Sequence, residues 1–180
     1  MGSNYDLLIA KINEFTQKFY LNKLLRGSIY AAATILGLYL VLFVLIYYTY
    51  PGVTTKTLLF FAFLTISLAA VVFWIVKPAL SYFKLGKTIS IEQASELIGN
   101  HFFNVKDRLL NTLQLKALAD VSPQNSALIL AGIDQKIGDL RPIPFSNAIN
   151  LKENKKHIKY ILMPLAIILL IGLIAPAILK

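Results

Sequence analysis

Three apolar blocks, each about as long as a membrane is thick, constrain the fold of this chain more than any other feature. They occupy residues 28–50, 57–77 and 159–180, and no Asp, Glu, Lys, Arg or His interrupts their centres. A helix of about 20 residues rises roughly 30 Å, which matches the hydrocarbon core of a bilayer. Charged residues make up 15% of the chain, whereas soluble domains carry about 25%. We therefore predict an all-α membrane protein with three transmembrane helices.

The distribution of lysine and arginine predicts which connections face the cytoplasm. Residues 1–27 and both ends of the connection 78–158 are basic, whereas the turn 51–56 carries a single lysine. Because basic loops stay on the cytoplasmic side, we expect the N-terminus and residues 78–158 there. The turn and the C-terminus would then face the opposite side, with Trp74 and Tyr160 at the cytoplasmic interface. The net charge of +9 is read as this orientation signal and as attraction to lipid headgroups, not as a sign of nucleic-acid binding.

The segment before the first block predicts an amphipathic helix over residues 4–25. Five apolar or aromatic residues recur there at helical spacing, namely Tyr5, Leu8, Ile12, Phe15 and Phe19. Such a helix could lie in the membrane interface, or it could pack on the cytoplasmic connection. The sequence leaves both alternatives open.

The connection 78–158 is predicted to form a small helical cytoplasmic unit of three helices. The first runs from Ile91 to about His101, because Ser90 and Gln93 form a capping-box pattern. The third starts at Ser122-Pro123, a cap residue followed by proline at the first helical position. Its apolar side is expected to contain Leu128, Ile129, Ile133, Ile137 and Leu140. A unit of this size is small for an independent core, so we expect it to lean on other parts of the chain, the membrane or a partner.

The second of these helices begins in the stretch NVKDRLL, where Asn104 is a good N-cap and Asp107 complements the positive end of the helix dipole. Its buried side is predicted from its apolar residues, which are Leu109, Leu110, Leu113 and Ala117. Lys106 and Arg108 are expected to project away from that side. We assign them, together with Lys155 and Lys156, to a face that contacts the membrane surface or an acidic partner.

The motifs of catalysis, metal binding and transport are weak in this sequence. There is no cysteine, the segment KLGKT lacks the first glycine of a phosphate-binding loop, and His101 and His157 have no second ligand at metal-binding spacing. We therefore predict no enzyme activity and no cofactor or metal. Ala33 and Gly37 form a small-xxx-small pair, which favours close helix packing within the bundle or self-association with a second copy.

Three segments of the chain resemble one bacterial membrane-protein family. They read NYDLLIAKINEFTQKFYLNKLLRG, KLGKTISIEQASELIGNHFFNVKDRLLNTLQLKALAD and KIGDLRPIPFSNAINL. The family is the uncharacterised domain-of-unknown-function family 4175, in its Bacteroidota form, and the similarity covers essentially the whole chain. The resemblance implies three spans near the N-terminus followed by a long periplasmic region. It also implies a possible partnership with a MoxR-type AAA+ ATPase system, and no catalytic residue.

These observations lead to a prediction of a multi-pass protein of the bacterial inner membrane that anchors and assembles other components. It would link a cytoplasmic partner to a periplasmic region, which we expect to follow Lys180 in a longer chain. The alternative is a small subunit of a transporter or channel complex. That role would need polar side chains along a pore, and the centres of the apolar blocks carry no Asp, Glu, Lys, Arg or His.

Overall fold

The computed structural model describes residues 4–102, 105–121 and 126–174, and their side chains outside 120–130. All regular structure in these ranges is helical, as the sequence predicted. The chain divides into two compact units. We call residues 4–19 with 87–150 the helical unit, and residues 20–86 with 151–174 the spanning unit.

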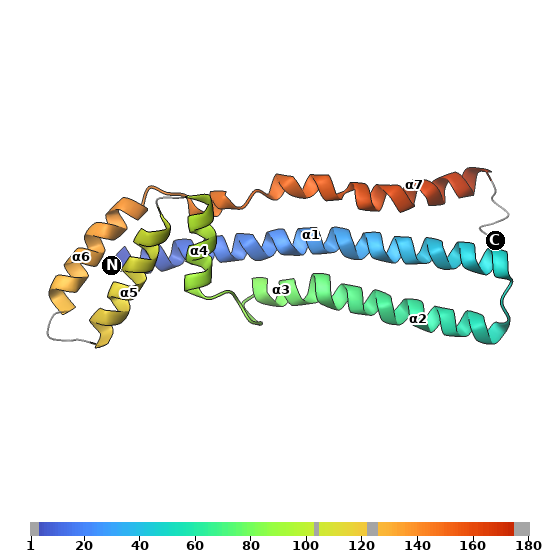
Figure 1. Ribbon diagram of the computed structural model, residues 1–180, viewed down its shortest axis with the longest axis horizontal. Helices are drawn as coiled ribbons and strands as arrows, with labels where there is room; N and C mark the ends of the chain where they lie inside the picture. The colour runs from blue at the N-terminus through green and yellow to red at the C-terminus, as the bar shows by residue number, and fades with distance from the viewer. Residues whose placement is uncertain (1–3, 103–104, 122–125, 175–180) are drawn as a thin grey trace. The chain divides into compact units, whose positions relative to one another are not determined.

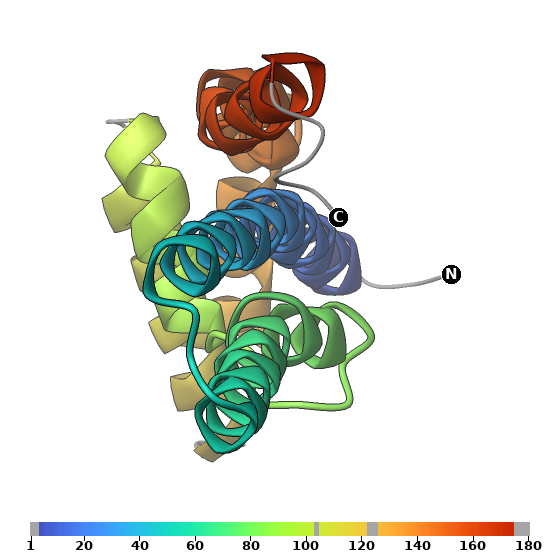
Figure 2. The same ribbon diagram turned by 90° about the vertical axis from the view of Figure 1, so that its right-hand side faces the viewer.

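The spanning unit contains the apolar parts of three long helical stretches. Helix α1 covers Asn4–Thr49 and contributes its first residues to the helical unit. The second stretch is α2 (Val53–Val71), the π-helical turn η1 (Val72–Val76) and α3 (Lys77–Tyr82), and the third is α7 (Lys159–Ile174). Within this unit, α1 lies between α2 and α7 (Figures 1 and 2). All three stretches are long and apolar enough to cross a membrane, which confirms the three predicted blocks as far as residue 174.

The predicted amphipathic helix and first span form one uninterrupted helix. No break separates residue 25 from residue 28, because LLRGS holds no proline and one glycine in a helix interior costs only about 1 kcal/mol. The helix ends where Tyr50 adopts a left-handed conformation, with φ of 44°, immediately before Pro51. Proline lacks the N–H that a continuing helix would need, so the chain turns back at this point.

The helical unit is built from the start of α1 and from α4 (Ile91–His101), α5 (Lys106–Val121) and α6 (Ser126–Leu140). Helix α5 contacts both α4 and α6 (Figure 1). Two 3₁₀ turns follow α6: η3 (Phe145–Ala148) belongs to this unit and η4 (Leu151–His157) to the spanning unit.

The core of the helical unit decides between the two alternatives for the N-terminal helix. Leu8, Ile12 and Phe15 of α1 are at most 2% exposed and belong to the buried cluster. Their partners come from α4, from α5 and the residue before it, from α6 and from η3, and are Ala94, Ile98, Val105, Leu109, Ile133, Ile137, Leu140 and Phe145. Full burial of such side chains stabilises by about 1.5–3 kcal/mol each. The apolar face of the N-terminal part of α1, at Leu8, Ile12 and Phe15, is therefore covered by protein.

The helix starts agree with the predicted caps where they are described. The Ser90 hydroxyl accepts from the Gln93 N–H at 3.2 Å, and the Gln93 side chain accepts from the Ser90 N–H at 3.1 Å, which confirms the capping box. The predicted starts at Asn104 and at Ser122-Pro123 lie outside the described residues. So do the side chains of Leu128 and Ile129.

The buried side of α5 differs from the prediction. Leu109 is buried as expected, but Leu110 and Leu113 are only half-buried and Ala117 is exposed. Thr112 and Ala119 take the buried positions instead. Thr112 can be buried, although it is polar, because its hydroxyl donates a hydrogen bond to the Arg108 carbonyl at 2.7 Å.

Candidate functional site

Aromatic side chains from three parts of the spanning unit meet at Tyr30 on α1. The Tyr30 ring centroid lies 6.1 Å from that of Trp74 on η1, 5.3 Å from that of His157 at the end of η4, and 6.0 Å from that of Tyr160 on α7. We call these four residues the aromatic junction. Tryptophan and tyrosine favour the boundary between lipid and water, because one part of the ring system is apolar and another is polar. The junction therefore marks an expected membrane boundary.

Hydrogen bonds join polar side chains beside the aromatic junction. The Tyr30 hydroxyl lies 3.0 Å from Nδ1 of His157. Asn154 is 5% exposed; its amide donates to Oδ1 of Asn22 at 2.6 Å, and its Oδ1 accepts from Nε of Arg26 at 3.4 Å. A buried amide left without partners would cost about 1–3 kcal/mol. These bonds therefore hold η4 against α1, although the sequence had singled out neither Asn22 nor Asn154.

Gly27 lets the backbone of α1 lie close to that of η1. A Cβ atom at this position would lie 1.9 Å from the carbonyl oxygen of Trp74. The neighbouring Ala31 and Ala70 are also buried, so small residues let α1 approach the second stretch closely.

The predicted packing pair takes no part in this contact. A Cβ atom at Gly37 would meet nothing within 4 Å, and Ala33 is half-buried. A role for Ala33 and Gly37 in self-association stays a prediction.

The excess positive charge of the protein belongs to the two stretches of sequence that contain the spanning unit. By sequence, residues 20–86 and 151–180 hold ten Lys and Arg against Glu153 alone, whereas residues 1–19 and 87–150 hold eight of each sign. Seven of the ten basic residues lie within seven positions along the chain of an aromatic-junction member. These seven, which we call the basic collar, are Lys23, Arg26, Lys77, Lys152, Lys155, Lys156 and Lys159.

Two members of the basic collar, Lys77 and Lys156, contact an aromatic ring and a carboxylate of the same unit. The Lys77 amine lies 4.0 Å from the Phe73 ring centroid, and the Lys156 amine lies 3.7 Å from a Glu153 carboxylate oxygen. The two predicted surface residues Lys155 and Lys156 are both exposed. One carboxylate cannot neutralise seven cations, so the basic collar keeps a net positive charge.

Arg108 is exposed as predicted and Lys106 is half-buried, and each is paired within the helical unit. The Lys106 amine lies 3.6 Å from Glu96 on α4, and the Arg108 guanidinium lies 3.5 Å from Asp139 on α6. The expectation that both simply project away is therefore corrected: they bridge α5 to its two neighbours. Exposed ion pairs contribute only about 0–1 kcal/mol, so either cation can exchange its partner for another acid at low cost.

His101 and Glu92, two further titratable residues of the helical unit, contact residues close to them in the sequence. His101 stacks edge-on against Phe102, with centroids 4.9 Å apart. The Ser90 hydroxyl and the backbone amide of Glu92 lower the pKa of the Glu92 carboxyl by hydrogen bonding. Among the described residues, no three His, Asp or Glu side chains gather to hold a metal ion.

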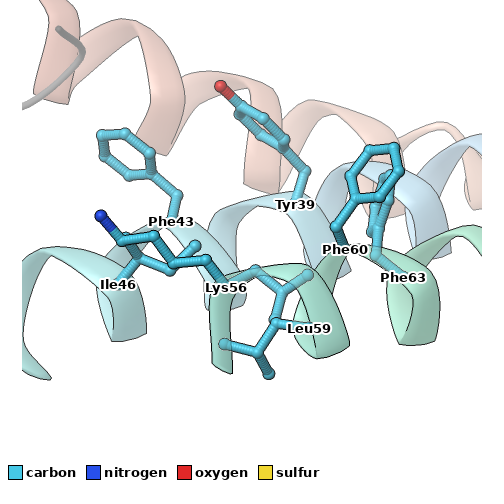
Figure 3. Close-up of a pocket in the computed structure, with 8 residues that line it drawn as sticks. Tyr39, Phe43, Ile46, Lys56, Leu59, Phe60 and Phe63 are labelled. Atoms are coloured by element: carbon cyan, nitrogen blue, oxygen red, sulfur yellow. The ribbon is translucent and has the colours of Figure 1, made fainter. Parts of the chain in front are cut away.

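An apolar groove of about 270 Å³ lies between α1 and α2 in the spanning unit. Leu42, Phe43 and Ile46 line it from α1, and Leu59 and Phe63 from α2. Figure 3 shows these walls together with two residues that carry polar atoms, Tyr39 and Lys56. The sequence analysis had not singled out this groove, because its walls come from two separate apolar blocks.

The fold and these features define a helical, multi-pass type of membrane protein, in which three helices long and apolar enough to span a bilayer share the chain with a packed helical unit. Comparisons of the chain with protein-family models, with curated protein sequences and with solved structures found no match. The family resemblance drawn from the sequence stays a prediction.

Proposed function

We propose that this chain is a non-catalytic anchor and assembly module of the bacterial inner membrane. The observation that carries the proposal is the division of charge between the two units. Residues 20–86 and 151–180, which contain the spanning unit, carry the whole net charge of +9 by sequence, whereas the helical unit is balanced and has a packed core of its own. Charge of this kind beside apolar helices orients and holds them in a bilayer. A balanced, folded helical surface suits contact with a protein partner.

In this proposal the N-terminus and the helical unit face the cytoplasm, and the turn between α1 and α2 faces the periplasm. The direct partner of the spanning unit is the lipid bilayer. The partner of the helical unit is a cytoplasmic protein, for which the family resemblance suggests a MoxR-type AAA+ ATPase system. A periplasmic region would be the component to which the module links that partner.

Orientation can be tested with single-cysteine variants, because the chain has no cysteine of its own. Thr54→Cys places a thiol near the start of α2, and Asn100→Cys places one on the exposed surface of α4. A membrane-impermeant maleimide added to intact spheroplasts should label Thr54→Cys, and should label Asn100→Cys only after lysis. The reverse labelling pattern would overturn the proposed orientation.

The partner face can be tested by exchanging the ion pair that holds Lys106. Glu96→Lys combined with Lys106→Glu keeps an attractive pair between α4 and α5 but exchanges the positions of the two charges. We expect recovery of cross-linked cytoplasmic proteins from solubilised membranes to fall at least about fivefold, which corresponds to about 1 kcal/mol. Lys136→Glu on α6 is the matched surface control. Recovery equal to that of the unmodified protein would remove Lys106 from the partner face.

The native size of the protein separates an anchor from a small subunit of a transporter. An immunoblot of native membranes, with an antibody against residues 78–157, should show a chain much larger than the 20.1 kDa of this sequence. A band near 20.1 kDa would contradict a covalently attached periplasmic region. Ion flux through vesicles containing the purified protein would instead favour the transporter alternative.

A further inference from the structure

The groove between α1 and α2 combines apolar walls with a single cation. Its lining includes the rings of Phe43, Phe60 and Phe63, and its only charged residue is Lys56. Figure 3 shows the Lys56 amine at the end of the groove beside Phe43 and Ile46, with the Phe60 and Phe63 rings towards the other end. The groove therefore has an apolar length and a charged end.

No acid of the spanning unit is available in this region. Residues 20–86 contain no Asp or Glu, and the one acid of the unit, Glu153, pairs with Lys156 in η4. Lys56 is exposed and forms no ion pair within the ranges that the structure describes. A lysine at the end of a span extends its stem along apolar surface and places its amine at the level of the headgroups. Among the described residues, its amine is therefore open to an anion from outside the chain.

The dimensions of the groove suit a lipid chain. Lys56 lies in the first turn of α2 and Phe63 two turns further on, so the apolar wall extends roughly 10 Å from the charged end at 1.5 Å per residue. A phospholipid has the same layout, with its charge at the interface and its acyl chain running parallel to the helices. The walls are open to the lipid phase on the exposed side of Phe60, which is 59% exposed.

We propose that this groove binds one acyl chain of an anionic phospholipid, whose phosphate pairs with Lys56. Within the part of the chain that the structure describes, no carboxylate nearby competes for the Lys56 amine. A lipid with a net negative charge is favoured over a zwitterionic one, because the positive group of a zwitterionic headgroup already offsets the charge of its own phosphate. The proposal rests on the spanning unit lying in a bilayer, as the proposed function also requires. It does not depend on any protein partner of the helical unit.

Quenching of a tryptophan in the groove by brominated lipids tests the proposal. Trp74 is the only tryptophan of the chain, so Trp74→Phe with Phe60→Trp moves the reporter into the groove. The full chain carrying both changes is reconstituted in phosphatidylcholine vesicles that contain increasing fractions of brominated phosphatidylglycerol or brominated phosphatidylcholine. Since an exposed ion pair contributes only modestly, we expect phosphatidylglycerol to bind about threefold more tightly, which corresponds to about 0.65 kcal/mol.

Three charge variants then assign the preference to one side chain. Lys56→Gln should reduce the ratio of the two binding constants to about one, and Lys56→Arg should keep it. Lys84→Gln removes the same charge after α3, away from the groove residues in sequence, and should also keep the preference. Both positions are exposed, so folding should be unaffected, which circular dichroism checks.

Several outcomes would overturn the proposal. Equal quenching by both lipids in the reporter protein would mean that the groove has no preference for an anionic headgroup. A preference that survives Lys56→Gln, or that Lys84→Gln also abolishes, would assign it to the net charge of the protein. Weak quenching by both lipids would show that another protein surface, such as a second copy of the chain, covers the groove. Because none of these readouts involves the helical unit, they leave the anchor role to its own tests.

Discussion

The hydroxyl of Tyr30 lies 3.0 Å from Nδ1 of His157, so a side chain of the first apolar helix is joined to the segment that leads into the third. The Tyr30 ring also lies near that of Trp74 in the second helical stretch and near that of Tyr160 in the third. One side chain of the first stretch thus lies beside both of the others. The aromatic junction is therefore one of the points where the three stretches come together.

Replacing Tyr30 should therefore weaken the spanning unit in two steps. Tyr30→Phe removes only the hydroxyl and should lower the free energy of unfolding by about 0.5–1.5 kcal/mol, the net value of one hydrogen bond. Tyr30→Leu also removes the ring contacts and should cost more. The midpoint of thermal unfolding in detergent micelles measures both. Tyr47→Phe, at an exposed tyrosine near the other end of α1, is the matched control, and an equal loss there would contradict the role of Tyr30.

Gly27→Ala should be strongly destabilising, because its methyl group would overlap the backbone of Trp74. A backbone atom cannot move aside as a flexible side chain can, and overpacking of this kind costs about 1–3 kcal/mol. We expect a lower thermal midpoint than that of the unmodified protein. Unchanged stability would mean that α1 and η1 are further apart than described.

Gly37→Ala is the counterpart of that substitution at an open position, and Gly37→Leu tests self-association. The position is open, and alanine is favoured over glycine inside a helix by about 1 kcal/mol, so the monomer should be unchanged or slightly more stable. If Ala33 and Gly37 pack against a second copy, Gly37→Leu should shift the protein from dimer to monomer in analytical ultracentrifugation. The same mass distribution for both variants would argue against self-association through this pair.

Lys11 links α1 to the end of α6, because its amine donates to the carbonyls of Arg141 and Ile143. These carbonyls follow the last turn of α6, where backbone acceptors lack helical partners. Hydrogen bonds from a charged donor contribute about 1.5–3 kcal/mol, so Lys11→Met should lower the stability of the helical unit by about that amount. Hydrogen exchange of the α6 amides measures the change. Lys136→Met, at an exposed site on the same helix, should leave exchange unaltered.

The Glu92 carboxyl should report the start of α4 through its titration. Its pKa is lowered chiefly by the Ser90 hydroxyl and then by the Glu92 backbone amide. A pKa that is lower in the folded than in the unfolded protein stabilises the fold above the unfolded value, and this contribution is lost as the pH falls through the folded value. Ser90→Ala should raise the pKa of Glu92, measured by carbon NMR of glutamate-labelled protein, whereas Ser146→Ala should not. An unchanged Glu92 titration in Ser90→Ala would contradict this hydrogen bond.

The parts of the fold that depend on local chemistry could be predicted from the sequence. Length and apolarity alone are enough to mark a span, and the capping box at Ser90 and Gln93 involves residues three apart. The environment of Leu8, Ile12 and Phe15 could not be predicted, because lipid and a protein core both satisfy an apolar helix face. The sequence pattern was the same for either outcome.

The candidate sites depended more on contacts between distant residues, and the sequence predicted them less well. Lys106 was expected to project away from its helix, but it is half-buried, and its partner Glu96 comes from another helix that only the fold brings close. Gly27 was overlooked because its close contact is with the backbone of Trp74, which no side-chain pattern encodes.

The π-helical turn at Val72–Val76 has a consequence for the second stretch as a whole. A π turn fits one extra residue into a helix, and each α-helical residue turns the chain by about 100°. Ala70 before the turn and Lys77 after it are therefore set at a different angle from the one that a regular helix would give them. Deleting a single residue of the turn would change the length of the span very little. It would instead rotate the remainder of the stretch about its own axis, so that Lys77 would point in another direction around the bundle.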